Sequence, residues 1–355
     1  MRLIDHPQYA AMLKEIQDSF PHWDALNGRT FLISGASGMI GSLMVDAVMM
    51  RNMTLPKRET CKVIAIGRDR AAADLRFEPW LHDPNYVFLS RDIGVPFCDF
   101  TEKPDYLVHA ASTTHPLAYL AEPVNTILTN ILGTRNLLDL SVQSPGSRFL
   151  LMSSVEVYGE NRGDTDYFTE DYCGYLDCNT LRAGYPEGKR ASEALCQAYI
   201  QQYGTNISII RLPRIYGPTM RMSDSKADAQ FIKRGIAGED IVLKSKGDQL
   251  YSYAHVADAV LGILWVLICG EQGMAYNLSD PKSDVTLKEL AEIVAVHAGT
   301  KVIFELPDQY EKKGYSTATK AILDAGRLRQ LGWIPRYDIR TGIRETMDIL
   351  QSLPG

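Results

Sequence analysis

The chain has 355 residues, of which 45% are hydrophobic and 23% are charged, and its formal net charge is -6. This composition is typical of a folded globular protein with one large or two modest domains, and it excludes the disordered, collagen-like and membrane-embedded classes. The 37 basic residues are outnumbered by 43 acidic ones and form no basic block at either end. We therefore expect no nucleic-acid partner.

The six cysteines are scattered without C-x-x-C spacing, which favours reduced thiols over a disulfide framework and gives no support for a metal site. The N-terminal segment lacks the unbroken apolar core of a secretory signal. The longest apolar run, Ala259–Cys269, is too short to cross a bilayer. We therefore expect a cytoplasmic protein with no membrane partner.

Residues 1–28 carry apolar side chains at roughly helical spacing, interrupted by Pro7 and ending near Pro21. They predict a helical extension that packs on the main domain or on a second subunit. From Arg29 onward, short apolar runs alternate with longer amphipathic stretches, which is typical of βαβ units around a parallel sheet. The expected buried strands are Thr30–Ser34, Cys61–Ile66, Tyr86–Ser90, Tyr106–Ala110, Arg148–Ser153 and Ile207–Leu212.

This pattern predicts an α/β fold in which residues 29–213 form a Rossmann-type, doubly wound parallel sheet domain. Residues 214–355 are expected to form a smaller, mixed α/β substrate-binding part with segments that cross back to the sheet. Its expected helices are Asp228–Ala237, Val256–Ile268, Thr286–Ala298 and Arg340–Leu350, and its expected strands are Ile241–Leu243 and Lys301–Glu305. The site should lie between the two parts, outside the carboxyl ends of the parallel strands.

A glycine-rich turn follows the first expected strand and precedes an apolar helix. It reads G-A-S-G-M-I-G and spans Gly35–Gly41. Glycines at this spacing allow a tight reversal and a close approach of backbone N–H groups to a pyrophosphate, beside the positive end of a helix. The turn therefore predicts a bound dinucleotide, NAD or NADP. Its expected contacts are Gly35, Ser37, Gly38, Met39, Ile40 and Gly41.

The end of the second strand bears on which dinucleotide is bound. An acidic residue there hydrogen-bonds the ribose 2′-hydroxyl, whereas an arginine accommodates a 2′-phosphate. Here the strand is followed by Gly67-Arg68-Asp69, and Arg68 slightly favours NADP, although Asp69 could still reach the ribose. Asp92, after the third strand, is placed to contact the adenine.

Two further segments carry groups suited to acid–base chemistry. Tyr185 and Lys189 form a Y-x-x-x-K pair, one helical turn apart on one face. A neighbouring ammonium, together with an oxidised nicotinamide, would stabilise the phenolate, which could then remove a hydroxyl proton as hydride leaves the carbon. Ser154 closes the fifth strand, where its hydroxyl can hydrogen-bond a developing carbonyl oxygen.

With these motifs together, the chain resembles the extended short-chain dehydrogenase/reductase superfamily, in its NAD-dependent epimerase/dehydratase branch acting on nucleotide sugars. The resemblance also includes V-H-A-A from Val108, S-S-V-E-V-Y-G from Ser153, R-I-Y-G-P from Arg214 and L-G-W-I-P from Leu331. It implies a triad of Ser154, Tyr185 and Lys189, and a homodimer. Further expected cofactor contacts are Ile93, Ala110, Ala111, Ser112, Asn130, Ser153 and Pro213. The expected substrate contacts are Thr113, Glu156, Arg214, Arg221 and Tyr251.

In this branch C4 of the sugar is oxidised to a ketone before the sugar decarboxylates, eliminates water or epimerises. Glu156 is similar to the glutamate of dehydratases and glucuronate decarboxylases, and it could remove the C5 proton or orient a sugar carboxylate. Val155 stands where many dehydratases have an aspartate, so the chain looks closer to a UDP-glucuronate decarboxylase. Arg214 replaces that family's asparagine, and Tyr251 stands near where relatives have a diphosphate-binding arginine.

Four interpretations follow from this sequence. The first is C4 oxidation followed by decarboxylation or elimination. The second is a nucleotide-sugar 4-epimerase, and the third is an NADPH-dependent keto-sugar reductase. The fourth, from a different class, is a non-catalytic dinucleotide-sensing protein. No metal ligands are expected.

Overall fold

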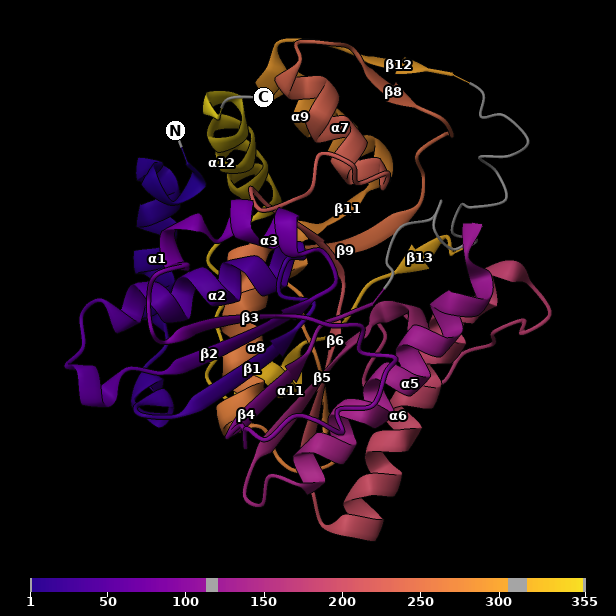
Figure 1. Ribbon diagram of the computed structural model, residues 1–355. Helices are drawn as coiled ribbons and strands as arrows, with labels where there is room; N and C mark the ends of the chain where they lie inside the picture. Colours follow the sequence, from indigo (N-terminus) through magenta and orange to yellow (C-terminus); the bar gives the residue numbers. More distant parts are fainter. Residues whose placement is uncertain (1, 113–120, 306–317, 354–355) are drawn as a thin grey trace.

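The computed structural model describes residues 2–112, 121–305 and 318–353. Its centre is a seven-stranded parallel sheet with the strand order β10-β6-β5-β4-β1-β2-β3 (Figure 1). The strands are β1 (Thr30–Ser34), β2 (Lys62–Gly67), β3 (Tyr86–Ser90), β4 (Tyr106–His109), β5 (Arg148–Ser154), β6 (Asn206–Leu212) and β10 (Ala275–Asn277). The order reverses between β1 and β4, which is the crevice where doubly wound sheets bind their ligands. The predicted Rossmann-type fold is therefore confirmed.

Helices cover both faces of this sheet because successive side chains of each buried strand point to opposite sides. On one face, Phe31 and Ile33 pack in a cluster with the helices α2 (Met39–Asn52) and α8 (Val256–Cys269). On the other, Leu32 packs with residues of α5 (Pro123–Val142) and α6 (Gly184–Tyr203). Figure 1 shows α5 and α6 side by side at the lower right.

The N-terminal helix α1 (Pro7–Ser19) packs on α2 and α8 of its own chain. The sequence analysis expected Pro7 to interrupt the helical pattern, and that expectation is wrong. Pro7 is its first residue, where a missing N–H costs nothing and a fixed φ suits the first turn. The Tyr9 hydroxyl donates a hydrogen bond to Asp46 of α2 at 2.6 Å, so the extension is tied to the sheet domain through a buried carboxylate.

The C-terminal part lies above the carboxyl ends of the sheet strands in Figure 1 and has its own apolar core. Its strands are β7 (Arg214–Tyr216), β9 (Leu250–His255), β11 (Asp284–Thr286) and β13 (Lys320–Ala321), with β8 (Ile241–Leu243) paired to β12 (Val302–Phe304). Its helices are α7 (Ala227–Ile236), α9 (Leu287–Ala298), α11 (Gly326–Gln330) and α12 (Ile339–Ser352). Two elements that follow residue 214, α8 and β10, lie against or within the large sheet.

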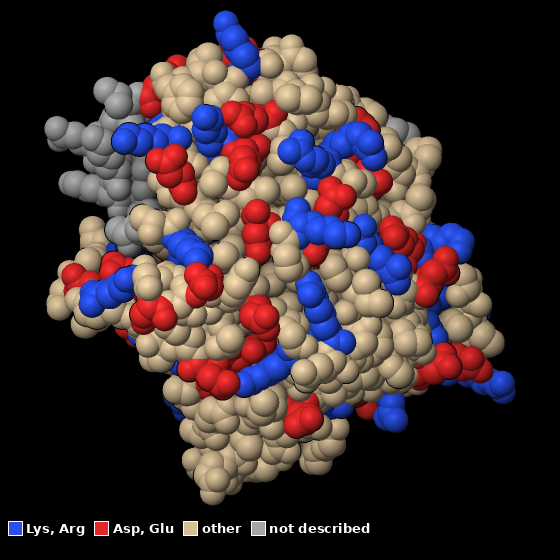
Figure 2. Space-filling view, turned by 180° about the vertical axis from the view of Figure 1, so that it is seen from behind, with Lys and Arg blue, Asp and Glu red and all other residues tan. Residues whose placement is uncertain are grey.

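The remaining helices of the described residues are short. They are α3 (Arg70–Arg76) and 3-10 turns at Leu3–Asp5, Trp23–Leu26, Lys57–Glu59, Glu78–Trp80, Val155–Tyr158, Leu181–Ala183 and Pro281–Ser283. Seen from behind, acidic and basic side chains are interspersed over the surface (Figure 2). Within residues 2–112, 121–305 and 318–353, no helix has the length and apolar character needed to cross a membrane.

Candidate active site

A cavity of about 780 Å³ lies where the sheet meets the C-terminal part. The glycine-rich turn and the carboxyl ends of the central strands form one side of its wall, and residues of the C-terminal part form the other. Ser154 at the end of β5 and Tyr185 in the first turn of α6 lie between the two halves. The cavity is therefore where the strand pattern predicts it.

The glycine-rich turn has a backbone shape that larger residues would disturb. Gly35 has φ +69°, and a Cβ there would lie 2.7 Å from the Ala111 backbone nitrogen. A Cβ on Gly41 would lie 2.5 Å from the Gly35 carbonyl oxygen. These glycines let the first turn of α2 approach β1 and β4 closely.

The same turn offers unused polar groups to a ligand. Gly38 caps α2 without a side chain, so the first N–H groups of the helix receive no side-chain acceptor. The Ser37 hydroxyl is buried and has no hydrogen-bond partner in the part of the chain that the structure describes. Helix N–H groups and a buried hydroxyl beside a cavity fit the pyrophosphate of a dinucleotide.

The residues that follow β2 and β3 also line the cavity. They are Arg68, Asp69 and Asp92. The Asp69 carboxylate caps α3 by accepting a hydrogen bond from the Ala72 N–H at 2.9 Å, and Asp92 accepts one from the Gly94 N–H at 2.8 Å. The Asp69 carboxylate is therefore engaged, whereas Arg68 has no ion pair in the described ranges.

Most of the remaining predicted cofactor residues line the same cavity; these are Met39, Ile40, Ile93, Ala110, Ala111, Ser112, Ser153 and Pro213. Asn130 differs, because it is fully buried behind the cavity wall and its Oδ1 accepts a hydrogen bond from the Ser112 hydroxyl at 2.9 Å. It holds a lining residue rather than facing the cavity. Thr113, a predicted substrate contact, lies outside the described residues.

The three predicted triad residues meet at this cavity. Burial raises the pKa of Tyr185 to about 12, while its hydrogen bond with Ser154 acts to lower it. Lys189 Nζ lies 6.0 Å from the centroid of the Tyr185 ring and donates a hydrogen bond to the Met152 carbonyl at 2.8 Å. Burial lowers the pKa of Lys189 to about 8, against the opposing charge of Glu193. In this protein the phenol is therefore protonated at neutral pH.

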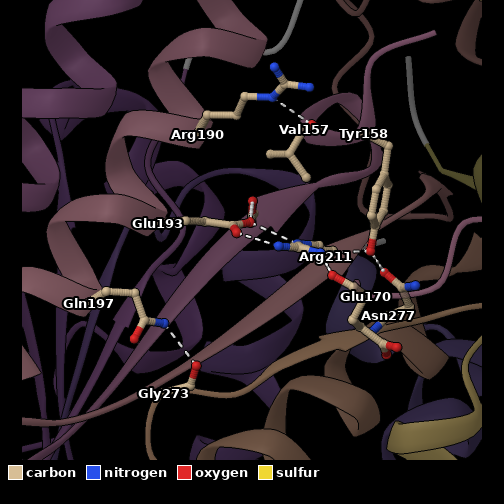
Figure 3. Close-up of polar contacts among 10 residues, drawn as sticks. Val157, Tyr158, Glu170, Arg190, Glu193, Gln197, Arg211, Gly273 and Asn277 are labelled. Carbon is tan, nitrogen blue, oxygen red and sulfur yellow. Dashed lines mark hydrogen bonds and ion pairs between the residues drawn. The ribbon is translucent and has the colours of Figure 1, made fainter. Parts of the chain in front are cut away.

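A buried polar network supports the triad from behind (Figure 3). Glu193, one turn after Lys189, accepts hydrogen bonds from Arg211 Nε at 3.0 Å and Nη2 at 2.6 Å. It also accepts one from the Ser153 hydroxyl at 2.5 Å, so Ser153 is engaged beneath the cavity. Figure 3 shows Arg211 between Glu193 and Tyr158, and Arg211 Nη1 donates to the Tyr158 hydroxyl at 2.9 Å.

An ion pair beside the triad was not predicted from the sequence. Arg182 Nη2 contacts both carboxylate oxygens of Glu156, at 3.0 and 3.1 Å. Both side chains line the cavity, and the Glu156 charge raises the pKa of Tyr185 while the Arg182 charge lowers it. The available signal was the place of Arg182, three residues and thus about one helical turn before Tyr185.

The structure places the predicted substrate contacts Arg214, Tyr251 and Arg221 in two different parts of the site. Arg214 and Tyr251 meet in the C-terminal wall, with the guanidinium carbon 3.3 Å from the ring centroid. Arg221 does not join them: it donates a hydrogen bond to the Ser37 carbonyl at 2.9 Å, which puts it against the glycine-rich turn. The sequence analysis also missed Asp228, a buried cavity residue whose pKa is raised by burial.

Within the described ranges, no group of three histidine, cysteine, aspartate or glutamate side chains could hold a metal ion. His109 and His255 are buried outside the cavity lining, and burial lowers the pKa of each to about 3. Both are therefore neutral at pH 7.

The chain is similar to known proteins over most of its length. The family model described as "NAD dependent epimerase/dehydratase family" matches residues 31–279. Over 317 residues the chain is 31% identical to UDP-glucuronic acid decarboxylase 6 of Arabidopsis thaliana, covering 88% of this chain and 86% of that protein. Over 323 residues it is 28% identical to UDP-glucuronic acid decarboxylase 1 of Xenopus tropicalis, covering 90% and 71%.

The fold is also found in solved structures. A double mutant of dTDP-glucose 4,6-dehydratase from Streptomyces venezuelae, solved with NAD, has a TM-score of 0.77 at 24% identity, covering 91% of this chain and 97% of that one. The chain therefore belongs to the NAD dependent epimerase/dehydratase family, as its motifs predict, and it is an enzyme of that family.

Proposed function

We propose that this enzyme oxidises C4 of a nucleotide-linked hexuronate to a ketone and then decarboxylates it, with UDP-glucuronate as the substrate to test first. The observation that carries the proposal is the position of Glu156. Its carboxylate is held by Arg182 at 3.0 and 3.1 Å, beside Tyr185. The similarity to UDP-glucuronic acid decarboxylases supports the same choice of reaction.

The ion pair favours decarboxylation over elimination on chemical grounds. Elimination needs a free base for the C5 proton and an acid for the leaving hydroxyl. Both oxygens of the Glu156 carboxylate already accept hydrogen bonds from Arg182, and Val155 beside it cannot protonate a leaving group. A 4-ketohexuronate needs neither, because it is a β-keto acid. Its C5–C6 bond breaks with loss of carbon dioxide, and the electron pair moves onto the C4 oxygen to give an enolate. The enolate then takes a proton from water at C5, which forms the new C5–H bond and restores the C4 ketone.

We assign the acid–base work to the triad. Bound NAD or NADP would supply the hydride acceptor and donor, and its oxidised form would place a positive charge beside the phenol. Tyr185 would take the C4 hydroxyl proton in the oxidation and return it to the C4 oxygen when the ketone is reduced. Ser154 would donate a hydrogen bond to the C4 oxygen while it carries negative charge. Lys189, held by the Met152 carbonyl, would stabilise the phenolate.

The test is incubation of the cofactor-loaded enzyme with UDP-glucuronate and, in parallel, UDP-glucose, dTDP-glucose and GDP-mannose, followed by NMR. The expected result is carbon dioxide and a UDP-pentose from UDP-glucuronate without added reductant. Loss of water would favour elimination, inversion at C4 would favour epimerisation, and stoichiometric NADPH consumption would favour a reductase. Retention of dinucleotide with no turnover on any sugar would favour a sensing protein.

We infer that NADP is slightly preferred over NAD. Arg68 lines the cavity at the end of β2, and the neighbouring Asp69 carboxylate is occupied with capping α3. Replacing Arg68 with alanine should weaken NADP binding more than NAD binding, measured by titration of cofactor-free enzyme. An equal effect on both dinucleotides would contradict the preference.

We also propose a homodimer formed through α5 and α6. The beginning of α5 exposes Val124, Ile127 and Leu128 on one face, and Leu181 is exposed just before α6. Burying these side chains against a second copy would remove them from water. The Val124→Glu/Leu128→Glu variant should run as a monomer in light scattering, while the wild type runs as a dimer.

The cysteines support a cytoplasmic location. The structure has six free cysteines, of which Cys98, Cys173 and Cys178 are exposed. Exposed free thiols persist in a reducing compartment. Fractionation of the source cells with an antibody against this chain should find it in the soluble cytoplasmic fraction.

A further inference from the structure

Arg214 has an unusual environment in the cavity wall. It begins β7, where it pairs with Tyr253 of β9, and it follows Pro213 directly. Its guanidinium carbon lies 3.3 Å from the centroid of the Tyr251 ring, which is a cation–π contact. No side chain or carbonyl of residues 2–112, 121–305 or 318–353 accepts a hydrogen bond from this guanidinium, and none forms an ion pair with it.

Other cations of the same wall are engaged. Arg221 donates to the Ser37 carbonyl, and Lys226 forms an ion pair with Asp224 at 3.4 Å. Arg234 donates to the Asp240 carbonyl at 2.6 Å. Arg214 therefore keeps five N–H donors for a group that enters the cavity.

The ring of Tyr251 is held in place beneath Arg214. The Tyr251 side chain is buried, and its hydroxyl donates a hydrogen bond to the Ala318 carbonyl at 2.7 Å. The parallel pairing of β7 with β9 fixes the two backbones. A planar guanidinium stacked on a fixed ring loses little freedom when it forms two parallel hydrogen bonds, which suits a carboxylate or a phosphate.

Arg214 also lies close to the reacting end of the cavity. It borders a small hollow together with Val155, Glu156 and Gly159, the residues that follow Ser154. The end of β6 leads directly to it, and Leu212 of β6 pairs with Ser154 of β5. A substrate oxygen bound by Arg214 would therefore be near the sugar that faces Tyr185.

We propose that Arg214 is the residue that binds the anionic group of the substrate, and that Tyr251 positions it. This inference rests on the proposed function, because it takes the substrate to be a nucleotide sugar. The group bound is a set of paired anionic oxygens, which a hexuronate carboxylate and the nucleotide diphosphate both supply. The experiment below distinguishes these two sources.

The test measures binding of UDP, UDP-glucose and UDP-glucuronate to the NAD-loaded enzyme by calorimetry, and turnover of UDP-glucuronate. Arg214→Gln should raise the Kd of at least one of these ligands tenfold or more. An effect on UDP-glucuronate alone assigns the carboxylate, and an equal effect on all three assigns the diphosphate. Arg214→Lys should recover only part of the loss, because an ammonium cannot form the paired contact.

Two further variants test the role of Tyr251. Tyr251→Phe keeps the ring and loses only the bond to Ala318, so its KM should stay within about twofold of the wild type. Tyr251→Leu removes the ring and should raise KM several-fold with a smaller change in kcat, as expected for a positioning residue. The matched control is Arg162→Gln, because Arg162 also stacks on a tyrosine, Tyr175, at 4.0 Å but lies outside the cavity.

Wild-type affinities in Arg214→Gln for every ligand that the wild type binds would overturn this inference and leave the proposed function standing. Wild-type enzyme that binds none of the three ligands would overturn the proposed function and this inference with it. Retained NAD binding in Arg214→Gln is the check on folding. If Arg214→Gln does not bind NAD, the affinity of Arg214→Lys for UDP-glucuronate is measured instead. A Kd equal to that of the wild type would then overturn the inference.

Discussion

Replacing Glu193 with glutamine removes one charge from the buried network behind the triad. The carboxylate accepts two hydrogen bonds from Arg211, at 3.0 and 2.6 Å, and one from Ser153 at 2.5 Å. The side chains of Glu193 and Arg211 are only 14% and 13% exposed. Glutamine has nearly the same shape, so the substitution tests the charge rather than the packing.

The expected loss of stability follows from the burial of this pair. Removing one partner of a buried ion pair costs about 3–5 kcal/mol, because the other charge is left uncompensated. Arg211 keeps two acceptors, the Tyr158 hydroxyl at 2.9 Å and the Glu170 carbonyl at 2.7 Å. Glutamine also retains one acceptor oxygen. We therefore expect the lower end, about 3 kcal/mol in the free energy of unfolding.

The same variant should shift the pH dependence of turnover. The Glu193 charge raises the pKa of Lys189 against the effect of burial, which brings that pKa to about 8. Without Glu193, Lys189 loses its proton at a lower pH. Because protonated Lys189 is proposed to stabilise the phenolate, the alkaline limb of the pH–rate profile should move to lower pH.

Urea unfolding followed by circular dichroism measures the first effect, and initial rates between pH 6 and 10 measure the second. Glu160→Gln is the matched control, since Glu160 pairs with Arg162 at 3.6 Å with both side chains largely exposed. It should cost less than about 1 kcal/mol. A Glu193→Gln loss no larger than that of this control would refute the reasoning, as would an unshifted alkaline limb.

Three further variants test separate parts of the structure. Tyr185→Phe should lower turnover about 100- to 10,000-fold, the range for loss of an acid–base group, while cofactor titration shows unchanged binding. Gly41→Ala should weaken dinucleotide binding at least about tenfold in the same titration, because its Cβ would lie 2.5 Å from the Gly35 carbonyl. Burial lowers the pKa of His255 to about 3. Below pH 6.5 the unfolded chain therefore binds a proton at this residue that the folded chain does not bind. The wild type becomes less stable as the pH falls for this reason. His255→Phe lacks this effect, and urea unfolding should find its stability relative to the wild type improved by about 2 kcal/mol between pH 7.5 and pH 5.

The strands of the sheet were predictable to the extent that each one was a continuous apolar run. β1 and β6 are buried on both faces, and their sequences are correspondingly rich in isoleucine, leucine and phenylalanine. The seventh strand, Ala275–Asn277, was missed because three residues carry no periodic signal. Its place is set by parallel pairing with β6, which only the folded chain reveals.

The candidate site also has a part that could be predicted from the sequence and a part that could not. The glycine-rich turn and the Tyr185–Lys189 pair are short local motifs, so their residues could be named from the sequence. The contact of Arg182 with Glu156 joins residues 26 apart, and that of Arg221 with Ser37 joins residues 184 apart. No local pattern encodes such contacts, which explains why the ion pair was missed and why the contact of Arg221 with the glycine-rich turn was not predicted.

The ionisation of Tyr185 depends on the charge of the group that binds in the cavity. Burial raises its pKa to about 12, and the charges of Glu156 and Arg182 act on it in opposite directions. These two side chains form an ion pair, so neither acts on the phenol as an isolated charge. Tyr185 would therefore lose its proton only when a positive charge, such as that of an oxidised nicotinamide, lies beside it. It would recover the proton when that charge is gone, which is the order that oxidation followed by reduction of one sugar requires.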